Sequence, residues 1–476
     1  MSYPGFQYDE ISTSLLSPSD YANPVPQDDY HLAVIGAGPA GLISAIGAAG
    51  LGARVALVEQ GFMGGDCLNV GCVPSKALLE YTKAVPDADF DDAFTHLRAV
   101  RAGIAPHDSV ARYNELGADV FLGAARFSSA GDLQVGETTL PARKIVICTG
   151  ARAALPPIPG LDDCDALTNE SIFNLTARPR SLAILGAGAI GAEMATVFAR
   201  LGVQVHLFEL AERVLPLEIP AASEAVAEAL VSLGVTLHLG QGVDSIARLD
   251  GSAGFAVAAA QRVEVERVFV ALGRTPNTDA LGLEHVAVTR DERGFIQTDD
   301  KLRTSNRKIY AAGDCTAQQQ FTHYADAQAR VVVQNALFAP TASVKNMIVP
   351  HCTYTSPEVA SVARTPDVDE SDYDKYEFDL AELDRSRTQP EGSGFASVLT
   401  RKGTDEIVAA TVVGEGAGDL LAGIMLLMSN GLGLSAMAKV MLPYPTRSEF
   451  LKRLADAYNK TRMTPLVARI FKWWFR

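Results

Sequence analysis

Two cysteines, Cys67 and Cys72, lie in the glycine-containing segment GGDCLNVGCVPSK, which spans residues 64–76. On a regular helix, residues five positions apart are about 140° apart around the axis, because each residue turns about 100°. Two such sulfurs would not meet, and a disulfide needs Cα atoms roughly 4.4–6.8 Å apart. A bridge therefore requires a distorted turn, which Gly71 would permit. Such a strained, accessible bridge would be labile and catalytic. The spacing fits equally well with two free thiols on a buried helix.

Composition narrows the class of protein. The 476 residues could form several domains, and 48% hydrophobic with 20% charged residues is typical of a globular chain. A formal net charge of −15 argues against nonspecific nucleic-acid binding, which needs a basic surface. Six cysteines in so long a chain do not resemble a secreted disulfide scaffold, so we expect a reducing, cytoplasmic compartment.

Neither a cationic leader nor a transmembrane helix is expected. The first basic residue is Arg54, and no apolar run reaches the roughly 18 residues that a membrane span needs. We also predict no metal-binding site.

An apolar run at residues 32–35 leads into the pattern Gly36-x-Gly38-x-x-Gly41. A helix of small residues follows, and then a second apolar run that ends at Glu59. In this strand–turn–helix–strand context, the glycines allow a pyrophosphate to approach the helix N-terminus, and the acid accepts hydrogen bonds from a ribose. The segment therefore predicts a dinucleotide-binding βαβ unit.

The same pattern recurs 150 residues later, with Gly186, Gly188, Gly191 and Glu209. Two such units imply two dinucleotides, most simply a bound flavin and a nicotinamide that visits it. A carboxylate at position 209 favours NADH, because it repels the extra phosphate of NADPH. The nearest cation in the sequence is Arg213.

Further apolar strands that end in glycine are expected within residues 144–150, 267–278 and 308–315. Gly150 and Gly273 end the first two strands, and Asp314 stands at the end of the third. Ligands bind at such strand ends in open α/β sheets, although each glycine alone would also fit a plain turn. From residue 346 the composition changes. A strand pair at 393–403 and 406–414 and a helix at 419–430 predict a separate α+β domain.

The last residues, 464–476, form an amphipathic pattern. One helical face would carry the apolar residues Leu466, Val467, Ile470, Phe471 and Trp474, interleaved with Arg469, Lys472 and Arg476. A helix docked on its own protein is one interpretation, and peripheral contact with a membrane surface is the other.

With these motifs in hand, residues 30–460 resemble the class I pyridine nucleotide-disulfide oxidoreductases, which include dihydrolipoamide dehydrogenase, glutathione reductase and mercuric reductase. The resemblance rests on GAGPAG, GGDCLNVGCVPSK, CTG, GAGAIGAE, ALGRTPN, AAGD and PYPTRSE, in the family's order. The Val-Pro-Ser-Lys ending of the cysteine segment leans toward mercuric reductase-like members. The implied fold is α/β, with two Rossmann-like dinucleotide-binding domains and a C-terminal α+β dimerisation domain.

The resemblance implies domain boundaries and a homodimer whose active site is shared between subunits. We expect an N-terminal arm at 1–28 and a discontinuous FAD-binding domain at 29–155 and 275–345. An NAD(P)-binding domain would span 156–274, a dimerisation domain 346–460 and an amphipathic tail 461–476.

The resemblance also assigns roles. FAD would lie along Gly36, Gly38, Gly41 and Glu59, with Gly65 near its pyrophosphate and Asp314 on its ribityl chain. NAD(P)H would bind at Gly186, Gly188 and Gly191. Lys76, paired with Glu193, would sit near the flavin, Cys72 would face the flavin, and Cys67 would be the exchange thiol. Thiolate attack is the chemical step, so Cys67 should be exposed and partly ionised.

The C-terminal segment Leu442–Glu449 departs from the disulfide-reducing relatives, which carry two histidines there. Leu442 and Tyr444 fill those positions, and a phenol with a pKa near 10 protonates a thiol poorly. Mercuric reductases are similar in having this tyrosine, but they also end in a vicinal cysteine pair, whereas this sequence ends in KWWFR. Tyr444 and Glu449 are candidate catalytic residues, although Tyr444 would also fit a packing role at a subunit interface.

Three functions remain open from the sequence. The first is an NAD(P)H oxidoreductase that passes electrons through FAD and the Cys67–Cys72 pair to a small disulfide, a metal ion of the Hg(II) type or another soft acceptor. The second is dihydrolipoamide dehydrogenase proper, with His323 or His351 as base. The third is a flavin-bearing redox sensor or membrane-associated partner protein.

Overall fold

The computed structural model describes residues 3–249, 254–363, 370–388 and 393–476. The chain divides into two compact units, and each is described by itself. Unit 1 comprises residues 1–186, 197–206 and 243–347, and unit 2 comprises residues 187–196, 207–242 and 348–476.

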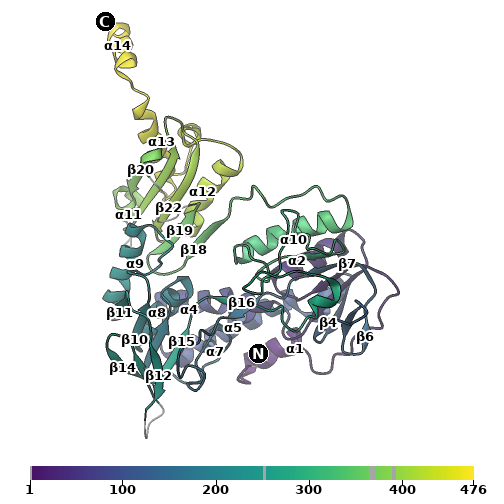
Figure 1. Ribbon diagram of the computed structural model, residues 1–476. Coiled ribbons are helices and arrows are strands. Elements are labelled where there is room, and N and C mark those ends of the chain that lie inside the picture. Colours follow the sequence, from purple (N-terminus) through teal and green to yellow (C-terminus); the bar gives the residue numbers. More distant parts are fainter. Residues whose placement is uncertain (1–2, 250–253, 364–369, 389–392) are drawn as a thin grey trace. The chain divides into compact units, whose positions relative to one another are not determined.

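Unit 1 contains a five-stranded parallel sheet with the strand order β17-β7-β1-β2-β3 (Figure 1). In that order, the strands are Ile309–Ala311, Ala142–Ile147, Tyr30–Ile35, Val55–Glu59 and Ala118–Leu122. Alternate residues of β1 enter different apolar clusters: Leu32 and Val34 belong to one, and Ala33 and Ile35 to the other. Both faces of the sheet are therefore buried, which is why β1 is an uninterrupted apolar run.

Helix α2 (Pro39–Gly50) follows β1 and packs against α10 (Thr322–Leu337), beside which it lies in Figure 1. Gly47 of α2 faces Val333 of α10, where a Cβ atom would lie 3.4 Å from the valine side chain, an ordinary van der Waals contact. The predicted helix of small residues is confirmed, and its N-terminus lies at the carboxyl end of β1.

Unit 1 also contains three small antiparallel sheets. They are β4-β5-β6 (Ala125–Phe127, Leu133–Val135, Thr138–Thr139), β12-β13-β14 (Ser245–Arg248, Phe255–Ala258, Arg262–Val265) and β16-β8 (Arg274–Pro276, Ala151–Ala153).

The second glycine pattern also stands between a strand and a helix, as predicted. The four-stranded sheet has the order β11-β10-β9-β15, with strands Thr236–Leu239, Gln204–Glu209, Ser181–Leu185 and Arg267–Val270. Helix α8 (Ala189–Arg200) follows β9 after the glycines, and β10 ends at Glu209. The sequence around β9, α8 and β10 thus repeats the local order of β1, α2 and β2.

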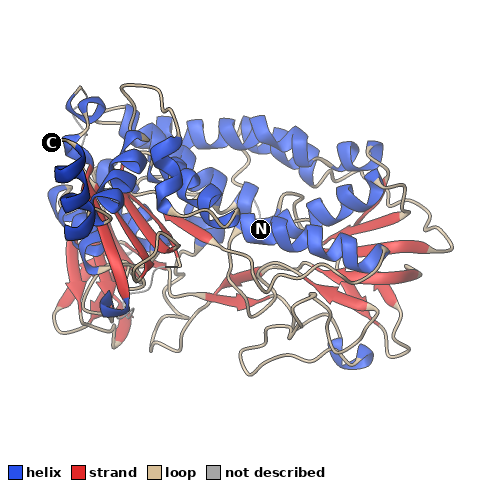
Figure 2. Ribbon diagram, turned by 90° about the horizontal axis from the view of Figure 1, so that it is seen from above, coloured by secondary structure: helices blue, strands red, loops and turns tan. Residues whose placement is uncertain are grey.

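Unit 2 contains a five-stranded antiparallel sheet, β18-β19-β22-β21-β20. Its strands are Pro350–Thr353, Glu358–Val362, Ile407–Gly414, Phe395–Arg401 and Tyr373–Asp379. Helices α12 (Ala417–Ser429) and α13 (Glu449–Thr461) bury Ile424 and Leu454 in its apolar core. In both units helices lie against the strands (Figure 2). The predicted strand pair and helix, and the α/β fold class with a C-terminal α+β part, are confirmed.

The N-terminal arm contains a helix that the sequence analysis did not predict, α1 (Gln7–Leu16). Its buried residues are Asp9, Ser12 and Leu16. Two of these three are polar, so the apolar periodicity that normally identifies an amphipathic helix is missing.

The remaining elements are short or connecting helices and the C-terminal helix. The α-helices are α3 (Gly65–Asn69), α4 (Cys72–Ala84), α5 (Phe90–Ile104), α6 (Val110–Glu115), α7 (Asn169–Ile172), α9 (Pro220–Ser232), α11 (Asp384–Arg387) and α14 (Pro465–Trp474). The 3-10 helices are η1 (Ala105–Asp108), η2 (Leu283–Val286), η3 (Glu370–Asp372), η4 (Leu380–Glu382) and η5 (Leu434–Lys439). Within the described ranges, every helix is too short or too polar to cross a membrane.

Candidate active site

The helix is interrupted between the two cysteines of the 64–76 segment. Helix α3 ends at Asn69, α4 begins at Cys72, and Val70 and Gly71 between them leave the helical conformation, Gly71 with φ −142° and ψ −113°. A Cβ atom on Gly71 would lie 2.8 Å from the carbonyl oxygen of Asp66, so a side chain does not fit there. The distorted turn predicted at Gly71 is present, and it removes the helical spacing that would hold the sulfurs apart.

The structure shows the pair as two thiols in contact with one another. A hydrogen bond with Cys72, followed by burial, raises the pKa of Cys67 well above its usual range. Cys67 is half-buried and Cys72 is exposed. The expectation of an exposed, partly ionised Cys67 is therefore wrong for the dithiol form, because its neighbour and its burial both favour the protonated thiol.

Thr322 joins the site from a distant part of the sequence. Its Oγ1 atom lies 3.4 Å from the sulfur of Cys72, and it is the first residue of the 16-residue helix α10. The N-terminus of a helix carries partial positive charge, which favours an anion such as a thiolate. Sequence analysis missed this residue, because no local pattern links positions 72 and 322. His323 follows it, with its ring stacked on Phe321.

The first glycine pattern forms a close-packed turn against the cysteine segment. A Cβ atom on Gly41 would lie 1.8 Å from the carbonyl oxygen of Gly36, and one on Gly65 would lie 2.6 Å from the Cα atom of Gly38. No side chain caps the N-terminus of α2. Glu59 accepts hydrogen bonds from the backbone N–H groups of Ala37 and Gly61, both at 2.7 Å. This open helix end, with an acid beside it, fits the diphosphate and ribose of FAD.

The second pattern repeats this arrangement. Glu209 accepts from the N–H groups of Ala187, at 2.8 Å, and Ala211, at 3.0 Å. A Cβ atom on Gly186 would lie 2.5 Å from the carbonyl oxygen of Ala271. Arg213 donates to the carbonyl oxygen of Pro216 rather than to a carboxylate. Gly188 precedes α8, and Gly191 lies within its first turn.

Asp314 lies three residues beyond the end of β17 and is paired with an arginine that sequence analysis did not single out. Arg274 approaches Asp314 at 3.5 Å and also pairs with Asp66 of α3. Burial raises the pKa of Asp314. The buried Nε atom of Arg274 is the atom that faces Asp314, without a hydrogen bond of good geometry. Arg274 directly follows Gly273 in the ALGRTPN motif. Its place in that motif could have identified it from the sequence as a site residue.

Gly150 and Gly273 flank one small sheet. Gly150 precedes β8 and accepts from the N–H of Asn277, while Gly273 precedes β16 and accepts from the N–H of Ala154. Both have positive φ angles, +66° and +105°, which favour glycine. The prediction that they bind a cofactor stays open.

Lys76 and Glu193 lie on α4 and α8. Glu193 accepts a hydrogen bond from the N–H of Tyr354 at 3.0 Å. The predicted ion pair of Lys76 with Glu193 stays a prediction.

The N-terminal arm packs directly on the cysteine-bearing segment. Asp9 of α1 forms ion pairs with Arg101, at 2.6 Å, and Arg98, at 3.5 Å, and all three side chains are almost completely buried. Arg101 also donates to the carbonyl oxygen of Asn69, the last residue of α3, at 3.1 Å. The hydroxyl group of Tyr3 donates to the side chain of the same asparagine. The arm therefore supports the helix that carries Cys67.

Tyr444 and Glu449 belong to unit 2. Tyr444 is 70% exposed and donates to Asp384 at 2.6 Å, and this hydrogen bond raises its pKa. Glu449 begins α13 and pairs with Arg453. A phenol with a raised pKa stays protonated at neutral pH, so in this chain it is suited to donate a hydrogen bond, not to accept a proton.

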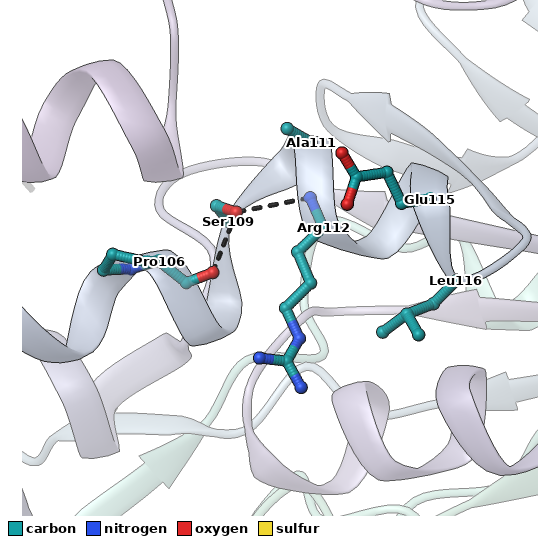
Figure 3. Close-up of a pocket in the computed structure, with 6 residues that line it drawn as sticks. All are labelled: Pro106, Ser109, Ala111, Arg112, Glu115 and Leu116. Atoms are coloured by element: carbon teal, nitrogen blue, oxygen red, sulfur yellow. Dashed lines mark hydrogen bonds between the residues drawn. The ribbon is translucent and has the colours of Figure 1, made fainter.

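A pocket of about 460 Å³ lies over α6, away from the predicted site residues in sequence (Figure 3). Its lining residues are Pro106, Ser109, Ala111, Arg112, Glu115 and Leu116. Ser109 caps α6 by accepting from the N–H of Arg112, and it donates to the carbonyl oxygen of Pro106. The hydroxyl group of Ser109 thus serves the helix end, and we assign the pocket no ligand.

Comparisons with known proteins agree with this geometry. Residues 30–330 match the family model described as pyridine nucleotide-disulphide oxidoreductase, and residues 349–455 match the dimerisation domain of the same family. A mercuric reductase of Staphylococcus aureus is 33% identical over 91% of this chain and 83% of its own length. A dihydrolipoyl dehydrogenase of Chlamydia muridarum is 31% identical over 88% and 95%.

Among solved structures, the Cu(II) complex of the HOCl-induced flavoprotein disulfide reductase RclA from Escherichia coli is similar to this chain. The TM-score is 0.83 at 28% identity, covering 89% of this chain and 99% of RclA.

Proposed function

The chain belongs to the pyridine nucleotide-disulphide oxidoreductase family, and we propose that it passes electron pairs from NADH, through FAD, to the Cys67–Cys72 pair and on to a soft acceptor. Family membership makes it an enzyme that depends on FAD and takes electrons from NAD(P)H. The single observation that carries the proposal is the contact between the two thiols across the break between α3 and α4.

Bound FAD would supply a two-electron redox centre that accepts hydride from a nicotinamide and reduces a disulfide. The chain's own residues provide the environment for this chemistry. The uncapped end of α2 with Glu59 would hold the diphosphate and ribose, and Arg274 would offer a cation beside Asp314. Thr322 and the N-terminus of α10 lie at Cys72, where they stabilise a thiolate.

The dithiol would transfer electrons to a disulfide acceptor by thiol–disulfide exchange. The Cys67 thiolate attacks one sulfur of a small disulfide, forming a mixed disulfide and releasing one thiolate. The Cys72 sulfur then attacks Cys67, reforming the Cys67–Cys72 bond and releasing the second thiolate. One dithiol is oxidised to one disulfide, the acceptor gains two electrons, and the two protons go to the released thiolates.

The choice of acceptor draws on the relatives and on Tyr444. Relatives named mercuric reductase and a solved Cu(II) complex of a flavoprotein disulfide reductase favour soft metal ions as substrates. Tyr444 stands where disulfide-reducing relatives carry a histidine. Its raised pKa keeps the phenol protonated at neutral pH, so it does not accept a proton there. We therefore infer a soft acceptor of either class, with Tyr444 and Glu449 of one subunit serving the cysteines of its partner.

An acceptor panel tests this proposal. Purified enzyme with NADH or NADPH should be offered small disulfides, Hg(II), Cu(II), quinones and oxygen, each with a Cys72→Ser variant in parallel. We expect turnover with one soft acceptor that depends on Cys72, and a preference for NADH because of Glu209. Turnover that is equal in the wild type and the variant for every acceptor would contradict the proposal.

Dihydrolipoamide dehydrogenase activity is the second candidate, favoured by the position of His323 next to Thr322 at the cysteine pair. His351 is held at 2.6 Å by the buried carboxylate of Glu218. Formation of NADH from dihydrolipoamide measures this activity directly, and we expect it to be weak.

The family's dimerisation domain supports a homodimer. A reducing, cytoplasmic compartment is part of the proposal. It is supported by Cys148, Cys164 and Cys315, which are all buried free thiols.

Exchange by the reduced enzyme should accelerate as pH rises. Contact with Cys72 and burial raise the pKa of Cys67, so the thiol is protonated at neutral pH and only its thiolate attacks. Below that pKa the thiolate fraction, and hence the rate, should grow about tenfold per pH unit. Stopped-flow mixing of reduced enzyme with an aromatic disulfide at pH 6, 7 and 8 measures the slope. A flat profile would show that Cys67 is already ionised.

Tyr444→His should increase turnover with small disulfides. An imidazole with a pKa near 6.5 exchanges protons at neutral pH, and such general acid–base catalysis contributes on the order of 10²-fold. The measurement is kcat with a small disulfide at pH 7. Tyr444→Phe is the matched control, because it removes the hydroxyl group without adding a titrating group, and it should show no gain. Equal kcat for the two variants would place Tyr444 outside the acceptor site.

A further inference from the structure

The local sequence favours the C-terminal helix α14 (Pro465–Trp474). The side chain of Thr464 accepts a hydrogen bond from the N–H of Val467, which caps the helix, and Pro465 occupies the first turn. Both features stabilise the N-terminus of the helix.

This helix separates apolar from basic residues. At about 100° per residue, the five apolar positions identified in the sequence fall within an arc of roughly 140°. Arg469, Lys472 and Arg476 fall within about 60° on the opposite side. Trp473 and Phe475 lie at the two borders of the apolar arc.

None of the residues of α14 is buried. Leu466 is 64% exposed and Trp474 is 74% exposed. The preceding helix α13, by contrast, buries Phe450 and Leu454 in the core of unit 2, and Figure 1 shows α14 beyond α13 at the end of the chain. The interpretation of α14 as a helix docked on its own protein is therefore wrong for the single chain.

The charge of this segment is opposite to that of the rest of the protein. Residues 457–476 contain Lys460, Arg462, Arg469, Lys472 and Arg476 and no aspartate or glutamate, in a chain whose formal net charge is −15. The two tryptophans of the protein, Trp473 and Trp474, both lie here. A basic segment on an acidic protein is complementary in charge to an anionic surface. Indole side chains favour the boundary between lipid headgroups and acyl chains.

We propose that α14 docks the enzyme onto an anionic lipid surface, lying parallel to the membrane with its apolar face in the headgroup region. Helices with one apolar aromatic face and one basic face bind in this way. Ten residues of helix span about 15 Å, half of a bilayer core, so the helix would lie on the membrane and not cross it. The match to the family's dimerisation domain ends at residue 455, before α14 begins.

Tryptophan fluorescence provides a local test, since both tryptophans report from α14. The full-length, FAD-loaded enzyme is mixed with large vesicles of phosphatidylcholine, with or without phosphatidylglycerol, and bound enzyme is also measured by sedimentation of the vesicles. We expect a blue shift of tryptophan emission and co-sedimentation with the anionic vesicles, both reversed by salt.

Three variants sharpen the test. Arg469→Gln with Lys472→Gln should weaken binding to anionic vesicles about 30-fold, since each cation near such a surface contributes roughly fivefold. Deletion of 464–476 should abolish binding. Leu217→Gln, which removes another exposed leucine of unit 2 (78% exposed), is the control and should bind like the wild type. NADH oxidation by each variant verifies folding.

Two results would overturn the proposal. One is the absence of both the emission shift and co-sedimentation. The other is a tail-dependent change of oligomeric state without lipid binding, measured by sedimentation equilibrium, which would assign the apolar face to a second copy of the chain. Neither result bears on the acceptor panel, because that panel contains no lipid.

Discussion

Cys72→Ser enzyme should take up about one electron pair in an anaerobic reductive titration, where the wild type takes up about two, because a disulfide is a two-electron couple. Reduction of a small disulfide by NADH should fall by about 10³-fold or more, as expected when a nucleophile that acts with its partner as a unit is removed. The structure gives the reason, since Cys67 and Cys72 are in contact and neither can exchange a full electron pair alone.

Cys164→Ala is the matched control, because Cys164 is a buried free thiol of the same unit to which no role in the site is assigned. It should keep the two-pair uptake and the turnover. Uptake of two pairs by Cys72→Ser would show that the second redox centre is another group. The same titration of Cys67→Ser should again give one pair.

Asp9→Asn should destabilise the protein by about 3–5 kcal/mol, the usual cost of removing one partner from a buried ion pair. The carboxylate of Asp9 pairs with both Arg101 and Arg98, whose side chains are 0% and 5% exposed. Without it, the two buried guanidinium groups beside the end of α3 would lose the carboxylate that they share. Thermal or urea unfolding followed by circular dichroism measures the loss, with the midpoint and the slope compared.

Glu10→Gln makes the same chemical change at the next residue of α1, where the side chain is exposed, and should alter stability by less than about 0.5 kcal/mol. Because Arg101 also holds the backbone of Asn69, Asp9→Asn should in addition speed alkylation of Cys67 in the folded enzyme. Equal stability of the two variants would show that the arm is not held by this ion pair.

The parts of the site made from contiguous residues could be predicted from the sequence. Gly36, Gly41 and Glu59 belong to one strand–turn–helix–strand unit, so their spacing alone indicates their geometry. Gly71 could be predicted for a similar reason, since the sulfurs of Cys67 and Cys72 cannot meet on an unbroken helix. In each case the chemistry constrains neighbouring residues.

The residues that were missed reach the site over long distances in the sequence. Thr322 is 250 residues from Cys72, and Arg274 is 208 residues from Asp66. Helix α1 escaped detection because its buried face contains Asp9, which is stable there only with arginines that lie some 90 residues further on. The ionisation of Cys67 was mispredicted because burial and a neighbouring thiol, not residue type, set its pKa.

The docking of α1 also implies an order of events as the chain folds. The break between Asn69 and Cys72 is local, whereas the ion pair of Asp9 with Arg101 closes a loop of 92 residues. The entropy of closure grows with loop length, and contacts distant in sequence form slowly. The two cysteines therefore come together while the arm is still free. Until the arm docks, the helix that carries Cys67 lacks the hydrogen bond that Tyr3 donates to Asn69.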